Sequence, residues 1–154
     1  MNSSDALCLF RGFSEQQITA AIAAAYEFVT AAGFSETAIY SDTIPDSLLD
    51  TNVGEHIETL IRNGIPRSRS NSDDSSSARA VLILTNNKQR LFKIMRGMKS
   101  VSEEPNDIIF ASITETALTW TFRSYFSHLS AEHDYMKTHS PEGDPDMKAE
   151  VEQD

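Results

Sequence analysis

Residues 80–85 read AVLILT, a short continuous apolar run that ends on a polar residue. A run of this length is typical of a β-strand covered on both faces, since a strand with one wet face would alternate apolar and polar residues. Asn86 and Asn87 follow at once and favour a turn into a helix. The apolar residues of that helix recur at helical spacing: Leu91, Ile94, Met95 and Met98.

The same order of signals stands at the start of the chain. Residues 6–10, ALCLF, predict a strand, and Gly12 a turn after it. Ser14 then predicts a helix start, because its hydroxyl can accept from the amide of Gln17 while the Gln17 side chain reaches back. Gly33 predicts the helix end.

Each half continues with a second strand and a second helix. In the first half we expect a weaker strand at 37–41 and a helix opened by Pro45 and Asp46 and ended at Asn63. In the second half, DIIFASI at 107–113 predicts a strand. A long helix is then expected from Thr114 through Lys137.

Alternating strands and helices predict the α/β class, with a mostly parallel four-stranded sheet flanked by helices. The similar order in residues 5–64 and 79–137 favours two strand–helix–strand–helix repeats. The expected architecture is a Rossmann-like or flavodoxin-like three-layer arrangement. We expect residues 1–137 to form a single domain.

Two segments are too polar to join a core. The serine-rich stretch 65–78 predicts a loop between the halves, and its arginine-flanked serines are also candidate phosphorylation sites. The acidic stretch 138–154, interrupted by proline, predicts a disordered tail.

The composition narrows the classes of partner. The formal net charge is −10, with 23 acidic against 13 basic residues, which argues against binding to nucleic acid or to an anionic membrane. The single cysteine, Cys8, lies in an apolar run, and a free buried thiol suits a reducing compartment. No signal peptide and no apolar stretch of about 20 residues is visible. We therefore expect a soluble, cytoplasmic protein.

Part of the second half resembles a known family. The residues that carry the resemblance are Ala80–Leu84, Phe110-Ala111, Thr114, Trp120, Leu129, Glu132-His133 and Tyr135-Met136. In that order they resemble a family of small uncharacterised bacterial domains, over about Ala80 to Met136. The resemblance implies a strand–helix–strand–helix unit closed by a tryptophan helix, and it implies no activity. Thr116-Ala117 stands where that family often has asparagine, which weakens the idea of a shared polar site there.

The histidines near the end of the last helix raise the question of a metal site. His128 and His133 are five residues apart and point about 140° away from each other on a helix, so they cannot share one ion. His128 and Glu132 are four apart and could, but two ligands are too few for zinc. We therefore expect no metal. Glu132 and His133 remain a candidate acid–base pair, and His56 is interpreted as a packing residue.

Ligands of open parallel sheets bind at the carboxyl ends of the strands. That rule selects a candidate ligand or partner surface: Arg11, Asp42, Asn86, Asn87, Lys88, Thr114 and Glu115. An arginine near a helix N-terminus could hold a small anion there. The same residue types also serve as helix caps and turn formers without any ligand, and we favour that interpretation.

Two other features could mark a partner surface. Trp120 falls opposite the apolar stripe of its helix, so it is either an exposed anchor or is buried against a neighbouring loop. No acid interrupts the cationic run between Arg79 and Lys99, which contains Lys88, Arg90, Lys93 and Arg96. This run is either a solvated helix face, the reading we favour, or a surface on which the acidic tail or an acidic partner docks.

The common nucleotide-binding, nucleophile-elbow and redox motifs are absent from the sequence, and no cofactor is expected. We therefore favour a non-catalytic interaction or regulatory module, with a protein partner or a second copy of the chain. A small-molecule or anion-binding domain, with its ligand in the strand-end crevice, is the first alternative. An enzyme that uses the Glu132 and His133 pair is the second.

Overall fold

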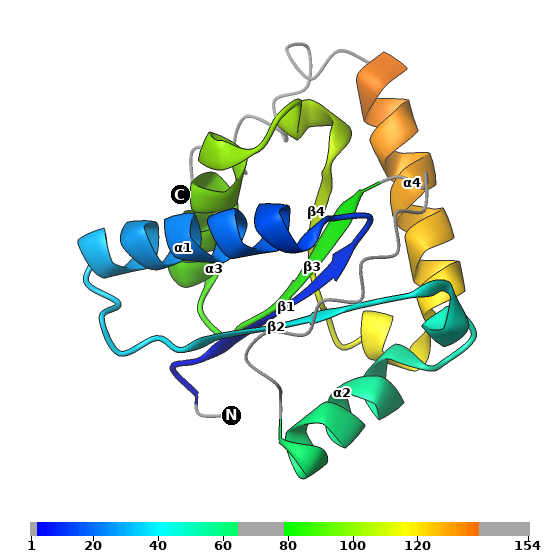
Figure 1. Cartoon of the computed structure of the whole chain (residues 1–154). Coiled ribbons are helices and arrows are strands. Elements are labelled where there is room, and N and C mark those ends of the chain that lie inside the picture. Colours follow the sequence, from blue (N-terminus) through cyan, green and yellow to red (C-terminus); the bar gives the residue numbers. More distant parts are fainter. Residues whose placement is uncertain (1–2, 65–78, 139–154) are drawn as a thin grey trace.

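The computed structural model describes residues 3–64 and 79–138, which form four strands and four α-helices (Figure 1). The first half contains β1 (Ala6–Arg11), α1 (Glu15–Ala31), β2 (Ile39–Thr43) and α2 (Val53–Asn63). The second half contains β3 (Ala80–Leu84), α3 (Lys88–Val101), β4 (Ile109–Ser112) and α4 (Phe122–Thr138). Short 3₁₀ helices lie at Asp46–Leu48, Pro105–Asp107 and Ala117–Thr119. The predicted loop at 65–78 and the tail from residue 139 lie outside the described residues.

The four strands form one sheet in the order β2-β1-β3-β4. β1 pairs parallel with β2, and β3 pairs parallel with β4. The two central strands, β1 and β3, pair antiparallel, with Leu9 opposite Leu82. The α/β class and the four-stranded sheet are therefore confirmed, and the sheet is mixed.

The antiparallel central pair corrects the expected Rossmann-like or flavodoxin-like arrangement, in which the paired strands would run in one direction. Helices cover both faces of this sheet, so the two central strands, β1 and β3, are apolar runs whatever their direction. The run AVLILT thus predicted a covered strand correctly and carried no information about which way the strand points.

Matching hydrogen bonds relate the two halves. The backbone N–H of Ile44 donates to the carbonyl of Phe10 over 2.9 Å, where the chain leaves β2. In the second half, Ile113 donates in the same way to Ile83 over 2.8 Å. Together with the antiparallel centre of the sheet, these paired contacts describe an approximate two-fold relation between the halves.

Both α2 and α4 begin later than the sequence predicts. Asn52 caps α2 by accepting from the amide of Glu55 (2.9 Å), and Thr121 caps α4 by accepting from the amide of Ser124 (3.2 Å). The two caps lie against each other as an antiparallel bridge. The bridge is held by two reciprocal backbone bonds: Val53 N to Trp120 O (2.9 Å) and Phe122 N to Thr51 O (3.1 Å).

This bridge explains the two late starts. A residue paired across a bridge must be extended, so the α-helices cannot start at Asp46 or Thr114 and run through Asn52 or Thr121. The preceding segments form 3₁₀ turns instead, and the hydroxyl of Thr114 accepts from the amide of Ala117 (3.2 Å) rather than capping α4.

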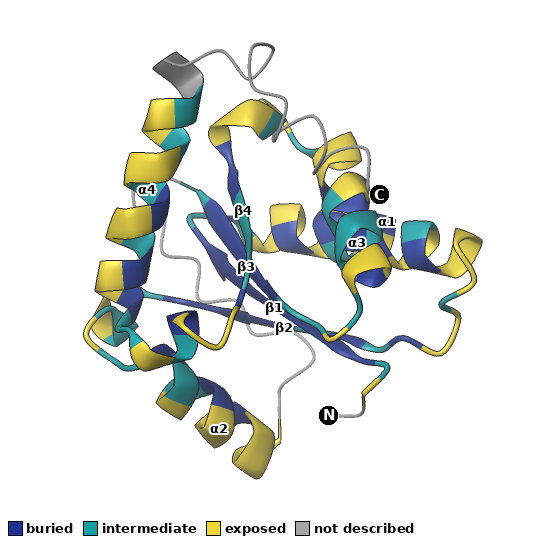
Figure 2. Ribbon diagram, turned by 180° about the vertical axis from the view of Figure 1, so that it is seen from behind, coloured by how far each residue is buried: buried dark blue, intermediate teal, exposed yellow. Residues whose placement is uncertain are grey.

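The core consists of two apolar layers, one on each face of the sheet (Figure 2). Cys8, Phe10 and Ile83 face α1 and α3, whereas Leu9 and Leu82 face the side of α2 and α4. Successive strand residues point to opposite faces, which is why neighbours such as Cys8 and Leu9 enter different layers.

The helices α1 and α3 pack closely at one point. A Cβ atom added to Gly97 of α3 would lie 2.7 Å from the carbonyl oxygen of Ala24 and 2.9 Å from the Cα of Ala25, both on α1. Both alanines are buried, so α1 presents its backbone there. Only a residue without a side chain permits this approach.

Gly97→Ala is expected to lower the free energy of unfolding by about 1–3 kcal/mol, because the added methyl overpacks against backbone that cannot rotate away. Helix propensity alone would favour alanine by about 1 kcal/mol, so the sign of the change is the test. Chemical denaturation measures it. Gln89→Ala, at an exposed position of the same helix, is the control and should stay within about 0.5 kcal/mol of the wild type.

Burial in the sheet raises the pKa of the Cys8 thiol to about 12. The thiolate is the reactive form, so the folded protein should not react with iodoacetamide at pH 8 and should react fully in denaturant. Mass spectrometry of the intact protein measures both states. Rapid alkylation under native conditions would contradict the buried position of the thiol.

Candidate functional site

The predicted strand-end residues do not come together at one crevice. Because β1 and β3 are antiparallel, their carboxyl ends lie at opposite ends of the sheet. Arg11 and Asp42 lie at one end, where β1 and β2 finish. The other candidates follow β3 and β4 at the opposite end: Asn86, Asn87, Lys88, Thr114 and Glu115.

At the end of the sheet where β3 finishes, the two asparagines accept hydrogen bonds from Arg90. Asn87 caps α3 by accepting from the amide of Arg90 (2.9 Å). The side-chain oxygen of Asn86 accepts from the Arg90 guanidinium over 3.2 Å. Their polar groups thus hold a helix start and a buried cation.

Trp120 precedes α4 and is half-buried. Its ring packs edge-on against Tyr125, with centroids 5.9 Å apart, and against His128 at 5.1 Å. The ring therefore packs against α4, which is neither of the two expected arrangements, a fully exposed anchor or burial against a neighbouring loop.

Near the end of α4, the carboxylate of Glu132 contacts His128, whereas the candidate acid–base pair joined it to His133. Glu132 Oε1 lies 3.1 Å from Nε2 of His128, and about half of each side chain is exposed. His133 Nε2 has no hydrogen-bond partner within the described residues. No group of three or more potential metal ligands occurs in residues 3–64 and 79–138.

The sequence did not indicate a pair that joins β2 to α2. Nε2 of His56 lies 3.7 Å from Oδ2 of the buried Asp42, too far for a hydrogen bond and close enough for an ion pair with a protonated imidazole. The His56 ring also packs edge-on against Phe122 at 5.6 Å. This confines the imidazole between the sheet and α4, as expected of a packing histidine.

Arg90 is buried, so it is not part of the exposed basic face predicted for α3. Its guanidinium donates to Ser3 O (3.4 Å), Thr85 Oγ1 (3.1 Å) and Asn86 Oδ1 (3.2 Å), and it lies 5.2 Å from the centre of the Phe34 ring. Arg90 therefore ties the residues before β1 to the end of β3.

The remaining cations make the exposed side of α3 positive. Arg96 and Lys99 are exposed and Lys93 is half-buried, and α3 contains no acidic residue. Lys99 also lies over the ring of Phe110 at 5.4 Å. In a chain of net charge −10, this side of one helix concentrates positive charge.

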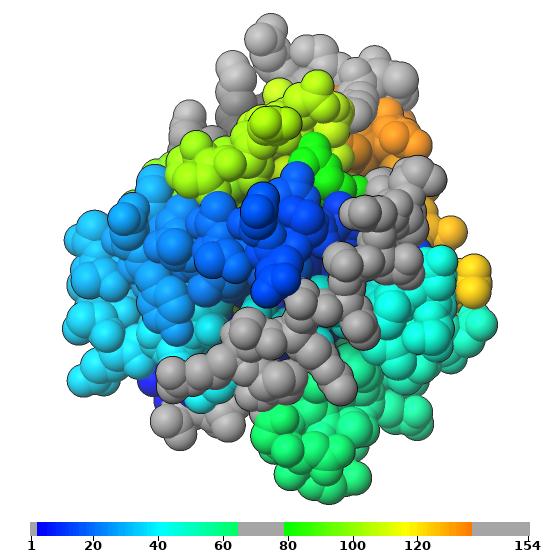
Figure 3. Space-filling view, viewed as in Figure 1, coloured from blue at the N-terminus to red at the C-terminus, as the bar shows by residue number. Residues whose placement is uncertain are grey.

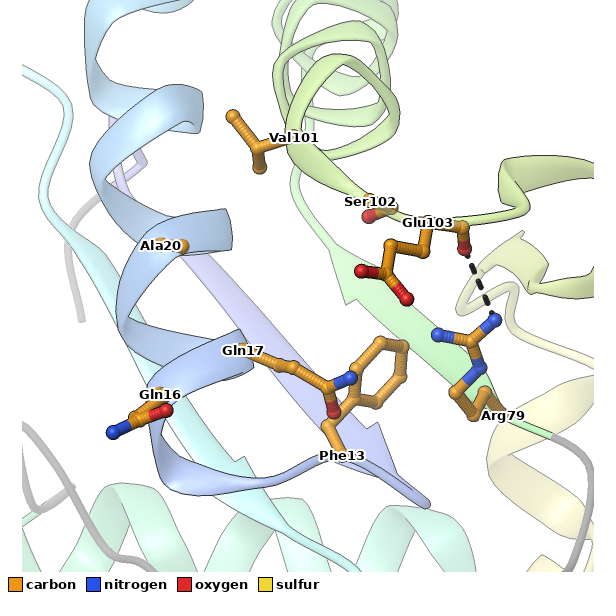
Figure 4. A pocket seen from close by; sticks show the side chains of 8 residues that line it. All are labelled: Phe13, Gln16, Gln17, Ala20, Arg79, Val101, Ser102 and Glu103. Carbon is orange, nitrogen blue, oxygen red and sulfur yellow. Dashed lines mark hydrogen bonds between the residues drawn. The ribbon is translucent and has the colours of Figure 1, made fainter.

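A groove opens where the N-terminus of α1 meets the C-terminus of α3 (Figure 4). Its cavity measures about 230 Å³, and Gln17 and Phe13 approach it from one side while Arg79 and Glu103 approach from the other. The Arg79 guanidinium lies 5.8 Å from the Phe13 ring centre and donates to the carbonyl of Glu103 over 3.1 Å. Val101, half exposed, forms part of the apolar wall.

A second groove lies at the other end of the same helix pair. Its apolar wall is formed by Phe28 and Ala31 of α1 and by Ala32, which caps that helix. Glu27 and Lys93 lie at its sides, and its cavity measures about 370 Å³. The exposed side of α3 and these two grooves are called the α1–α3 surface below. Figure 3 shows α1 and α3 adjoining on this face of the molecule.

Comparison with known proteins found one family model that matches part of the second half. Residues 79–136 match the model of a domain of unknown function, DUF3783. The match spans β3 to α4, less than half of the chain, and confirms the resemblance found in the sequence. The family description gives no activity. No curated protein and no solved structure matches the chain.

The matched segment contains α3 and its cations, whereas α1 lies in the half outside the match. The α1–α3 surface is therefore formed jointly by the two halves. None of the described helices has the length and apolar character needed to cross a membrane.

Arg90→Gln is expected to lower the free energy of unfolding by about 2–3 kcal/mol, because it removes the charge-assisted hydrogen bonds that the buried guanidinium donates. Arg62→Gln, at an exposed position of α2, is the matched control and should change it by less than about 0.5 kcal/mol. Urea denaturation compares them. Equal, small effects of both substitutions would show that Arg90 does not hold the N-terminal residues.

Proposed function

We propose that the protein is a non-catalytic interaction module that binds an acidic polypeptide segment on the α1–α3 surface. One observation carries the proposal: the exposed side of α3 is cationic without a single acid, and a groove with an apolar wall lies at each end of its contact with α1. A partner segment that combines acidic and apolar side chains matches both features.

The division of roles follows from the geometry. Lys93, Arg96 and Lys99 would steer an acidic segment and fix its direction, because exposed charges contribute more to association rate and specificity than to affinity. Apolar side chains entering beside Phe13 or Phe28 would supply the buried area. Binding by such a surface weakens as the salt concentration rises.

Photo-cross-linking tests this proposal. A photoreactive amino acid at Gln16, on the rim of the groove shown in Figure 4, should cross-link a partner in extracts of the native host. The cross-linked partner peptide, identified by mass spectrometry, should be acidic. The same amino acid at the exposed Glu58 of α2 is the positional control and should not capture that peptide.

The double substitution Lys93→Glu and Lys99→Glu should weaken the purified complex by about tenfold or more, because it replaces attraction with repulsion at two positions. Arg62→Glu reverses one charge on α2 and should leave the affinity unchanged. Titration calorimetry at low and at physiological salt measures both. A neutral or basic cross-linked peptide, or equal losses in both variants, would rule out this binding mode.

The acidic residues of the segment 139–154 offer a second occupant for the same surface. Deleting that segment separates the two cases. If the tail competes, the deletion should strengthen binding of the partner and change amide exchange along α3 at low salt. If it does not compete, both measurements should match the intact chain, and the partner proposal stands alone.

A further inference from the structure

On the opposite face of the sheet, a cavity of about 260 Å³ lies beneath α4. Arg11, the last residue of β1, contributes to its wall, and Ala80 and Ile109 mark the starts of β3 and β4 there. The cavity therefore lies where the carboxyl end of β1 adjoins the amino ends of β3 and β4.

The polar groups of this cavity are all hydrogen-bond donors or hydroxyls. Arg123, Ser127 and Ser130 line it from α4, and their spacing of four and three residues puts them on one side of that helix. Arg11 faces them from the sheet. Among the described residues that line the cavity, none is an acid, a histidine or a cysteine. Such a set suits an anion and offers no general base.

Arg11 is held in place before any ligand arrives. Its guanidinium donates to the carbonyl of Ile44 over 2.8 Å and to Asp46 over 2.6 Å, and it lies 5.7 Å from the ring centre of Phe126. The residue is only 8% exposed. A fixed, largely desolvated cation loses little conformational entropy when it binds an anion.

The acids that pair with the two arginines are mostly in solvent. The side chain of Asp46 is 63% exposed and that of Asp50, which pairs with Arg123 over 2.8 Å, is 82% exposed. The pKa of Asp50 is lowered, first by the hydrogen bond that Arg123 donates and to a smaller extent by the positive charge of Arg123. This carboxylate therefore stays ionised. A ligand must therefore compete with two water-screened carboxylates, which favours a doubly charged group over a single carboxylate.

We propose that this cavity binds a phosphate monoester with a small apolar body, its phosphate between Arg11 and Arg123 and its body against Phe126 and Ile109. The serine hydroxyls of α4 donate to the remaining phosphate oxygens. The volume limits the body to about the size of one aromatic ring, since drug-sized ligands occupy roughly 300–1,000 Å³. The site lies on the face opposite the α1–α3 surface, so it is independent of the interaction proposed there.

Phenyl phosphate is the probe, and inorganic phosphate and benzoate separate the contributions of its two parts. Titration calorimetry on the full chain should show saturable binding of phenyl phosphate and at least about tenfold weaker binding of either smaller probe, because each lacks half of the contacts. Amide shifts in a titration by NMR should map to residues 123–130. Equal, unsaturable responses to all three probes would overturn the proposal.

Variants then assign the binding to this cavity. Arg123→Gln removes the exposed cation and should weaken phenyl phosphate binding by about tenfold, whereas Arg62→Gln should leave it unchanged. Ser127→Leu places an apolar side chain in the cavity at an exposed helix position and should abolish binding without loss of thermal stability. Undiminished binding by the Ser127 variant, or equal losses in the two arginine variants, would place the phosphate elsewhere.

Discussion

The antiparallel pairing of β1 with β3 is the constraint on which the rest of the structure depends. It places Leu9 opposite Leu82 at the centre of the sheet and leaves β2 and β4 at the edges. With each half built as a strand, a helix and a parallel strand, this one pairing brings α1 beside α3 on one face. It also sends the carboxyl ends of the two parallel pairs to opposite ends of the sheet.

A second antiparallel contact joins the two halves on the face of the sheet that α2 and α4 cover. The caps of α2 and α4, Asn52 and Thr121, meet in an antiparallel bridge, and each helix start donates a hydrogen bond to the half across from it. A backbone N–H in the first turn of a helix has no acceptor within the helix, so the partner half satisfies it. Gly54 permits the approach, since a Cβ there would lie 2.8 Å from the carbonyl oxygen of Leu118. The two halves therefore complete each other's helix ends as well as each other's sheet.

Local signals in the sequence were sufficient to predict which segments form strands and helices. Most of the differences, such as the late starts of α2 and α4, arise from contacts between the two halves. The capping box of Ser14 and Gln17 is present, and Asn87 caps α3. The late start of α4 depends on a backbone bridge to residues about 70 positions away, which no local pattern encodes. Helical spacing placed Arg90 among the cations of α3, but the residues that bury it, Ser3 and Phe34, come from the other half.

The candidate sites show the same division between local and distant information. The cationic run of α3 was readable because charge is a property of the sequence itself, whereas the grooves beside it exist only where α1 packs against α3. Arg11 was selected by the strand-end rule, but its companions in the cavity, Arg123 and Ser127, lie on α4 and reach it because β3 runs antiparallel to β1. Had the sheet been parallel throughout, Arg11 would have faced the turn that follows β3. The direction of one strand thus decides which polar residues share a cavity.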